Sequence, residues 1–411
     1  MRWSTPEQAS AAERPAAAWL DALAARLEGR AERSALAPLE CLKRGRRKAL
    51  YRVAAPGGGT LLVKVNRYAD GAGRARRLRA SKAQRELRVA GRLRAAGIPT
   101  PLPLAAGESR ERGRLALCCL VLRELPGACD LAQHASRGLG ARERRALARA
   151  LGQLARQLHD AGLDQPDFAP NNLLRLASGE LVPIDFERAR FRRRVSQRRR
   201  LAMLAQLEAR HPDAGTAELW RALCAYCRGE REAARRLLPA LGAARRRLAR
   251  RELAHWRRAA ARADRRLAPL ARGDWRGVAL RGHPALAGLE PGAAGSGAAS
   301  LAVSEHRATT PARLFGSASW LHARGLHAQP IACLARAGEL RLWVAPEPGA
   351  RALAGSGTAP PLAAARRAAE RRLARALGRP LEIPAALWLA APRPGRGGLR
   401  LQLCAPPPEL C

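Results

Sequence analysis

Three oxygen-bearing side chains stand close together in the middle of this 411-residue sequence. Asp167 is followed by four residues and then by Asn172, and Asp185 comes thirteen residues later, directly before Phe186. Phosphoryl transfer needs a carboxylate that orients and deprotonates the acceptor hydroxyl, and oxygen ligands that hold Mg²⁺ on the phosphates. Asp167 fits the first role, and Asn172 and Asp185 fit the second.

The same chemistry needs a cation for the α- and β-phosphates and an acid that positions it. Lys64 lies in the apolar segment Leu61–Val65, and it is one of only four lysines in a chain with 71 arginines. A lysine among apolar residues of a strand is costly unless it is paired or functional. Ser81 and Gln84 form a capping box that opens a helix, and Glu86 lies on the apolar face of this helix, where it could meet Lys64.

Short periodic segments surround these residues and predict how they are positioned. Two apolar runs separated by a Pro-Gly-Gly-Gly turn predict a β-hairpin, and a continuous apolar run predicts a buried strand. A leucine-striped segment predicts a helix immediately before Asp167. The predicted strands are residues 49–54, 60–65, 115–122, 173–174 and 181–185, and the predicted helices are residues 81–97 and 141–159.

Each of these residues has an ordinary interpretation when it is taken alone. Asp167 could be a turn residue, Lys64 an edge-strand lysine and Glu86 a surface residue of a helix. Their joint order favours a kinase fold, because an Asp, four residues, an Asn and an Asp-Phe thirteen residues on have the spacing of a kinase catalytic loop and its metal-binding strand. We therefore predict an α+β, bilobal protein-kinase-like fold for the first part of the chain.

Over residues 40–228 the sequence resembles the lipopolysaccharide core kinases, a bacterial family of eukaryotic-kinase-like enzymes that phosphorylate Kdo or heptose. The resemblance implies ATP, Mg²⁺, a sugar hydroxyl of a lipid-linked saccharide as acceptor, and a place at the cytoplasmic face of the inner membrane. It also implies a hinge at Glu124–Gly127 that holds adenine through backbone hydrogen bonds. The segments that carry it are residues 50–53, 63–65, 86, 95–101, 123–127, 158–162, 167–172 and 184–186.

The sequence departs from the family pattern at three places. Gln165 and Pro166 stand where the family usually has His-Arg before the catalytic Asp, so the side chain that normally braces the loop is missing. Glu187 replaces the glycine after Asp-Phe, as is frequent in this family. No GxGxxG loop is present, so the predicted lid over ATP is the basic segment Lys43–Arg47, with Lys43 as an ATP-binding residue.

Charge and composition bound the partners. The formal net charge is 75 − 34 = +41, which predicts acidic partners. Aromatic residues make up only 4% of the chain, which disfavours nucleic acid because base stacking needs them. The Arg-rich segment Arg245–Arg266 predicts a helix for an anionic membrane surface. The alternative is that its apolar stripe packs on the kinase C-lobe and the arginines are solvated.

No apolar run approaches the roughly 20 residues of a bilayer-crossing helix, and no signal-peptide pattern opens the chain. We therefore expect a cytoplasmic protein, peripheral at the inner membrane. Nine scattered cysteines predict free thiols instead of a disulfide framework.

The domain organisation follows from shifts in composition and from one internal echo. Motifs of residues 93–98, 103–105 and 124–127 recur in weaker form at residues 321–326, 330–332 and 347–349, which predicts a smaller, degenerate kinase-like α+β region without catalytic residues. The predicted parts are an N-terminal extension with a short helix (1–37), a kinase N-lobe (38–124), a kinase C-lobe with a basic helical end (125–270), a linker (271–300) and the degenerate region (301–411).

The leading functional prediction is an ATP-dependent sugar kinase of the lipopolysaccharide inner core. Two alternatives stay open. The first is a catalytically weak pseudokinase scaffold of envelope biogenesis, and the second is a protein or small-molecule kinase that uses the same residues on another acceptor.

Overall fold

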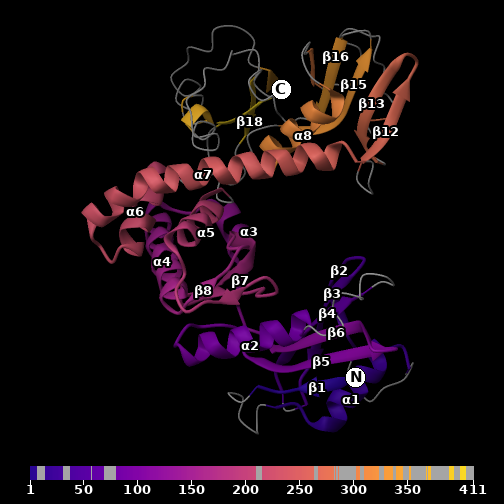
Figure 1. Ribbon diagram of the computed structural model, residues 1–411, viewed down its shortest axis with the longest axis vertical. Coiled ribbons are helices and arrows are strands. Elements are labelled where there is room, and N and C mark those ends of the chain that lie inside the picture. Colours follow the sequence, from indigo (N-terminus) through magenta and orange to yellow (C-terminus); the bar gives the residue numbers. More distant parts are fainter. Residues whose placement is uncertain are drawn as a thin grey trace. The chain divides into compact units, whose positions relative to one another are not determined.

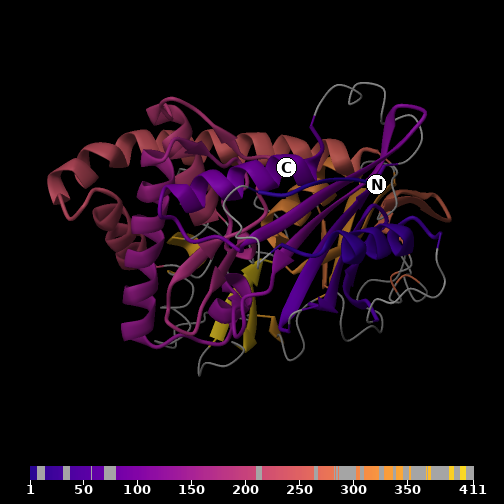
Figure 2. The same ribbon diagram turned by 90° about the horizontal axis from the view of Figure 1, so that it is seen from below.

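The structure is a computed structural model of the whole chain, shown in Figures 1 and 2, and it falls into two compact units. The first unit comprises residues 1–135, 140–203 and 216–234, and the second comprises residues 136–139, 204–215 and 235–411. The residues that the structure describes are 1–6, 14–30, 38–56, 58–68, 80–209, 215–262, 267–281, 283, 286, 302–305, 310–323, 328–336, 339–345, 351–352, 367, 369–371, 388–392 and 399–403.

The N-terminal part of the first unit is a six-stranded antiparallel sheet. Its strand order is β1-β5-β6-β4-β3-β2, so β4, which carries Lys64, is enclosed by β3 and β6. The predicted hairpin and the predicted buried strand are confirmed. The strands are β1 (Arg2–Ser4), β2 (Glu40–Arg44), β3 (Lys48–Ala54), β4 (Thr60–Arg67), β5 (Pro103–Glu111) and β6 (Arg114–Arg123).

Two helices cover opposite faces of this sheet. Along β6, Cys119 and Val121 pack with the leucines of α1 (Ala17–Leu27), whereas Cys118 and Leu120 pack with α2 (Lys82–Ala95). This alternation is the period of two that a strand buried on both faces must show. Figure 1 shows the two helices on opposite sides of the strands, and Figure 2 shows α1 in front of them.

The N-terminal segment is part of this lobe, and its prediction as an extension is corrected. Arg2–Ser4 pairs with β5 in antiparallel register, and Leu20, Leu23 and Leu27 of the predicted short helix are buried against the sheet. The helix was visible in the sequence as a leucine stripe. The strand was not, because three residues are too short to show a period.

The helical part of the first unit carries the second set of predicted site residues. The predicted leucine-striped helix is α4 (Ala141–Asp160), and it packs against α6 (Thr216–Tyr226) at Gly152, where a Cβ would lie 2.0 Å from the carbonyl oxygen of Ala222. Short elements follow or flank α4: β7 (Cys129–Asp130), α3 (Leu131–Ser136), β8 (Leu163–Asp164), the 3₁₀ helix η3 (Pro170–Asn172), β9 (Leu173–Arg175), β10 (Leu181–Pro183), β11 (Arg190–Phe191) and α5 (Gln197–Ala209), which is divided between the two units.

The second unit begins with the long basic helix α7 (Arg231–Ala260), which belongs to it from Arg235 onward. Ala260 packs into a core with Leu314 and Phe315 of α8 (Pro311–His322), and the backbone of Gly316 lies against Arg257 so closely that a Cβ would be 2.7 Å from its Cα. The prediction that the stripe packs on the kinase C-lobe is therefore corrected for this end of the helix, which packs on the C-terminal α+β part.

The predicted linker and the predicted end of the helical region are also corrected. The helix ends at Ala260, and residues 267–280 form a hairpin of β12 (Leu267–Arg272) and β13 (Trp275–Leu280). Buried Trp275 and Ala279 fix this hairpin in the core of the second unit, a contact that the local Gly and Pro content does not show. Residues 288–300 of the predicted linker lie outside the described residues.

The C-terminal sheet repeats the element order of the N-terminal lobe with a different strand order. With β1 left out, both sheets have five described strands with a helix between the third and the fourth in chain order, which is the order that the predicted echo implies. The third strand is enclosed in the first lobe, however, whereas here β14 (Ala302–Glu305) is at the edge, in the order β12-β13-β15-β16-β14. The remaining strands are β15 (Gln329–Arg336), β16 (Glu339–Ala345), and a separate sheet of β17 (Arg351–Ala352), β18 (Trp388–Pro392) and β19 (Leu399–Leu403).

Candidate active site

Lys64 lies at the centre of a compact group of charges. Its Nζ is 2.7 Å from a carboxylate oxygen of Glu86 and 2.9 Å from one of Asp185. The three residues come from β4, from α2 and from the loop after β10, and their side chains are 18%, 6% and 34% exposed. The structure thus brings together three residues that the sequence analysis singled out, including the predicted pair of Lys64 and Glu86.

Glu86 is positioned by the cap and the packing of α2. Ser81 caps the helix by accepting a hydrogen bond from the backbone N–H of Gln84 at 3.2 Å, which is one of the two bonds of the predicted capping box. The backbone N–H of Ser81 donates to Glu108 at 3.0 Å instead of to the Gln84 side chain. Leu87 and Ala83 pack on the sheet face formed by β5 and β6, and this contact fixes the rotation of the helix. Glu86 is therefore held on the side of Lys64.

Asp185 adopts a left-handed backbone with φ = 61°, a conformation that costs an L-residue free energy and persists only where the surroundings hold it. One such support is Gln165, whose Nε2 donates a 2.9 Å hydrogen bond to the backbone oxygen of Asp185. Gln165 is itself 3% exposed. The departure from His-Arg therefore does not leave the loop without a brace, because the glutamine supplies one.

The loop that carries Asp167 is tied to the strand before Asp185. The Asn172 Nδ2 donates to the backbone oxygen of Asp167 at 2.8 Å, and the backbone N–H of Ile184 donates to the backbone oxygen of Asn172 at 2.9 Å. Asp167 is half-buried and Asn172 is buried. Since the amide nitrogen of Asn172 is engaged, its Oδ1 is the atom through which this side chain would bind a metal.

Glu187 is a member of the charge group that the sequence analysis did not assign. Its carboxylate accepts hydrogen bonds from Lys48 at 2.7 and 2.8 Å and from Lys82 at 2.7 Å, and it lies 3.3 Å from the Nζ of Lys64. Three of the four lysines of the chain therefore meet at one buried carboxylate. The scarcity of lysine was the signal that could have found it.

The charges of the group shift one another's pKa. Burial raises the pKa of Glu86 to about 7, against the opposing pull of Lys64. Burial would also raise the pKa of Glu187, but Lys64 and the hydrogen bonds from Lys48 and Lys82 outweigh it and hold this pKa at about 2. Burial lowers the pKa of Lys64, and the three carboxylates more than reverse this, so that the lysine stays charged.

The donor set fits a hard divalent cation. Carboxylate oxygens of Glu86, Asp185 and Glu187 all lie within 4.8 Å of one another, and carboxylate and amide oxygens are the ligands that Mg²⁺ prefers. Glu86 and Glu187 are engaged by lysines, so Asp185, the most exposed of the three, and Asn172 are the residues that fit Mg²⁺ held on a nucleotide.

Glu124 and Lys43 lie elsewhere in the N-terminal lobe. Both carboxylate oxygens of Glu124 accept hydrogen bonds from Arg52 at 3.1 Å, and its backbone N–H donates to the oxygen of Thr60 at 3.0 Å. Its carbonyl is therefore the backbone group through which it would meet adenine. Lys43 is exposed on β2 opposite Leu50, and among the described contacts it is Lys48, not Lys43, that reaches the carboxylates. The adenine and lid roles of Glu124 and Lys43 stay predictions.

The model of a known protein family covers most of the residues of this site. Residues 59–226 match the model of the Lipopolysaccharide kinase (Kdo/WaaP) family. The match includes Lys64, Glu86, Asp167, Asn172 and Asp185, and it confirms the resemblance to the lipopolysaccharide core kinases that the motifs predicted. The α+β fold of the matched segment agrees with the kinase-like fold expected from it.

Two curated relatives are both 3-deoxy-D-manno-octulosonic acid kinases, from Xanthomonas oryzae pv. oryzae strains PXO99A and KACC10331 / KXO85. Each is 38% identical over 135 residues, which is 32% of this chain and 49% of the relative. The chain therefore spans about half the length of the curated relatives it matches. A solved structure, "WaaP in complex with acyl carrier protein", is 24% identical with a TM-score of 0.42, and the likeness covers 60% of this chain and 98% of that chain.

None of the helices that the structure describes is both long and apolar enough to cross a bilayer.

Proposed function

We propose that this protein is an ATP-dependent kinase that phosphorylates a sugar hydroxyl of the lipopolysaccharide inner core. The observation that supports it most is the placement of Lys64 between Glu86 and Asp185, at 2.7 and 2.9 Å. A lysine held by a helix acid beside a metal-binding aspartate is the arrangement that phosphoryl transfer uses to align a triphosphate.

The residues divide the work of the transfer. Lys64 binds the α- and β-phosphates, and Glu86 holds Lys64 in place. Asp167 accepts the proton of the sugar hydroxyl as its oxygen forms a bond to the γ-phosphorus, while the bond from that phosphorus to the β-phosphate oxygen breaks and ADP leaves. Asn172 and Asp185 would hold Mg²⁺, which neutralises the charge that develops on the phosphate oxygens. Positioning and charge neutralisation supply the rate.

The acceptor is either Kdo or heptose, and the curated relatives favour Kdo. Both are named 3-deoxy-D-manno-octulosonic acid kinases, and each is 38% identical to this chain over 135 residues. The alternative acceptors are a protein or a small molecule. An assay that compares phosphate transfer to these acceptors with transfer to the lipid-linked sugar distinguishes them.

Such an acceptor is attached to a lipid, so the enzyme would work at an anionic membrane surface on the cytoplasmic side. Helix α7 supports this place, because Arg246, Arg247, Arg250 and Arg251 are all exposed along it. Each basic residue near an anionic leaflet contributes on the order of 1 kcal/mol of attraction.

The scaffold alternative is tested by the mass of the lipopolysaccharide. In a strain that lacks this protein, we expect the inner core to lose the mass of one phosphate. The wild-type gene restores it, and the Asp167→Asn gene, whose product cannot accept the hydroxyl proton, does not. Full restoration by Asp167→Asn would favour the scaffold and contradict the kinase.

A further inference from the structure

Three lysines, Lys48, Lys64 and Lys82, surround Glu187. The position of Lys48 among them suggests a role besides its ion pair with Glu187. We infer that Lys48 is a phosphate-binding residue. When a nucleotide is present, Lys48 moves away from Glu187 and binds the β- or γ-phosphate, the role that a glycine-rich loop has in other kinases. The inference rests on the proposed function and adds a residue to that same site.

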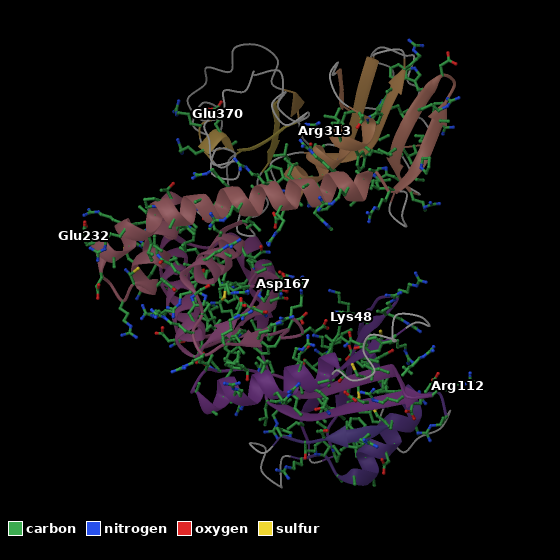
Figure 3. The ribbon with its side chains drawn as sticks, in the orientation of Figure 1. Lys48, Arg112, Asp167, Glu232, Arg313 and Glu370 are labelled. Atoms are coloured by element: carbon green, nitrogen blue, oxygen red, sulfur yellow. The ribbon has the colours of Figure 1, made fainter. Side chains whose placement is uncertain are left out.

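The register of β3 and β4 places Lys48 and Lys64 on one face of the sheet. Leu50 is the cross-strand partner of Lys64, and Lys48 stands two residues before Leu50, opposite Asn66. Side chains two residues apart on a strand share a face, so Lys48 and Lys64 project from the same face of the sheet. Figure 3 shows Lys48 at the side of the N-terminal sheet nearest to the helical part that carries Asp167.

Lys48 has the most exposed side chain of the three lysines that meet Glu187. The side chain of Lys48 is 51% exposed, against 30% for Lys82 and 18% for Lys64. Lys48 begins β3, directly after the turn closed by the hydrogen bond from the N–H of Gly45 to the oxygen of Lys48 at 2.8 Å. Of the three lysines it is the one that solvent, and therefore a phosphate, reaches most readily.

The carboxylate of Glu187 stays compensated by other cations when Lys48 moves away. If Lys48 leaves, Glu187 keeps Lys82 at 2.7 Å and Lys64 at 3.3 Å, and its backbone oxygen keeps the hydrogen bond from Arg85 at 2.8 Å. A buried carboxylate that loses every cation is costly, but Glu187 keeps two of its three lysines. Lys82 begins α2, where the helix dipole disfavours a cation, and Glu187 compensates for that position.

The balance of charge in the group also favours a role for Lys48 in binding phosphate. Lys48, Lys64 and Lys82 face three carboxylates, those of Glu86, Asp185 and Glu187, so the group is neutral when all three carboxylates are ionised. A nucleotide with Mg²⁺ brings net negative charge, and a flexible cation at the edge of the charge group would neutralise part of it. Lysine suits this role as a compact, flexible point charge that binds phosphate.

The test is binding of Mg·ATP and of AMP to the full chain by isothermal titration calorimetry. Lys48→Met keeps the apolar stem and removes the charge, and Lys48→Arg keeps the charge. Arg88→Ala, on the exposed side of α2, is the matched control with the same loss of charge. We expect Lys48→Met to raise the Kd of Mg·ATP about tenfold and leave the Kd of AMP unchanged, with Lys48→Arg and Arg88→Ala near the wild type.

Equal weakening of Mg·ATP and AMP by Lys48→Met, or no weakening of either, would overturn the inference while leaving the kinase in place, because Lys48 would then be a clamp only. Wild-type protein that binds no Mg·ATP would overturn the proposed function as well. Unfolding temperatures of all variants, measured without nucleotide, show whether Lys48→Met retains the fold, and Lys48→Arg carries the comparison if it does not.

Discussion

Gln165 donates a hydrogen bond from its Nε2 to the backbone oxygen of Asp185 over 2.9 Å. It stands two residues before Asp167, at a position where the resembling family usually has histidine. The bond supports Asp185 in a left-handed conformation that needs support. A residue that seemed a defect in the sequence is thus a positioning residue in the structure.

Changing Gln165 should therefore affect the transfer step more than nucleotide binding. We expect Gln165→Leu to lower kcat about five- to tenfold, the equivalent of one lost hydrogen bond to a constrained group, with the KM for ATP changed less than twofold. Gln165→His, which can donate to the same oxygen, should keep most of the activity. Steady-state kinetics of the three proteins decide the matter, and equal rates in Gln165→Leu and wild type would refute the role.

Glu86 should impose a pH dependence on nucleotide use. Burial raises the pKa of Glu86 to about 7. As the pH rises through neutrality, Glu86 therefore becomes a carboxylate anion that can hold the ammonium group of Lys64. We expect kcat/KM for ATP, which reports the free enzyme, to rise between pH 6 and 8 and then level off. In Glu86→Gln this rise should disappear, leaving a lower, flat profile. A profile in Glu86→Gln that still rises by the same factor would assign the titration to another group.

His159 should make the first unit less stable in mild acid. It is buried, with ring nitrogens 2.9 Å from the Tyr226 hydroxyl and 3.2 Å from the Met203 sulfur, and burial followed by the charge of Arg200 lowers its pKa from 6.5 to about 4. Between these values the unfolded chain binds a proton that the folded chain does not. The free energy of unfolding should therefore fall by about 2 kcal/mol from pH 7 to pH 5.

Denaturant unfolding at several pH values measures this slope. His159→Asn keeps a polar group at the position but removes the titration, so its stability should fall less between pH 7 and pH 5 even if its stability at pH 7 is lower. Parallel slopes in the two proteins would show that His159 is not the group responsible.

Gly152 should be irreplaceable where α4 meets α6. A Cβ there would lie 2.0 Å from the Ala222 oxygen, so Gly152→Ala must push two packed helices apart, at a cost of roughly 1 to 3 kcal/mol. Gly242 in α7 is the control, because a Cβ there meets only the end of the Arg246 side chain at 3.7 Å. Gly242→Ala should be neutral or stabilising by up to about 1 kcal/mol. Thermal unfolding of both variants compares them, and similar effects would contradict the close packing.

The features that the sequence predicted correctly are those that local pattern determines. The hairpin around the glycine turn, the capped helix of Glu86 and the leucine-striped helix before Asp167 all show a period or a cap within a few residues. The meeting of Lys64 with Glu86 was predicted from helix periodicity, across 22 residues of chain.

The features that were missed depend on contacts between distant residues. Lys48 and Lys82 lie 139 and 105 residues from Glu187 in the chain, and no periodicity connects them. The packing of α7 on α8, the strand that was predicted as a linker and the edge position of β14 have the same origin. Each of these features depends on which surfaces pack together in three dimensions, and local patterns in a single sequence do not show this packing.

In the proposed function, Lys64, Asp167 and Asp185 act together on a nucleotide and a sugar hydroxyl. Transfer of the γ-phosphate from labelled ATP to Kdo-lipid A tests it most directly, with the Asp185→Ala protein as control. We predict labelled lipid with the wild-type chain in the presence of Mg²⁺, and a loss of at least a hundredfold in rate with Asp185→Ala. Equal label in both proteins would contradict the account, as would a folded wild-type chain that labels neither this lipid nor its heptose-bearing form.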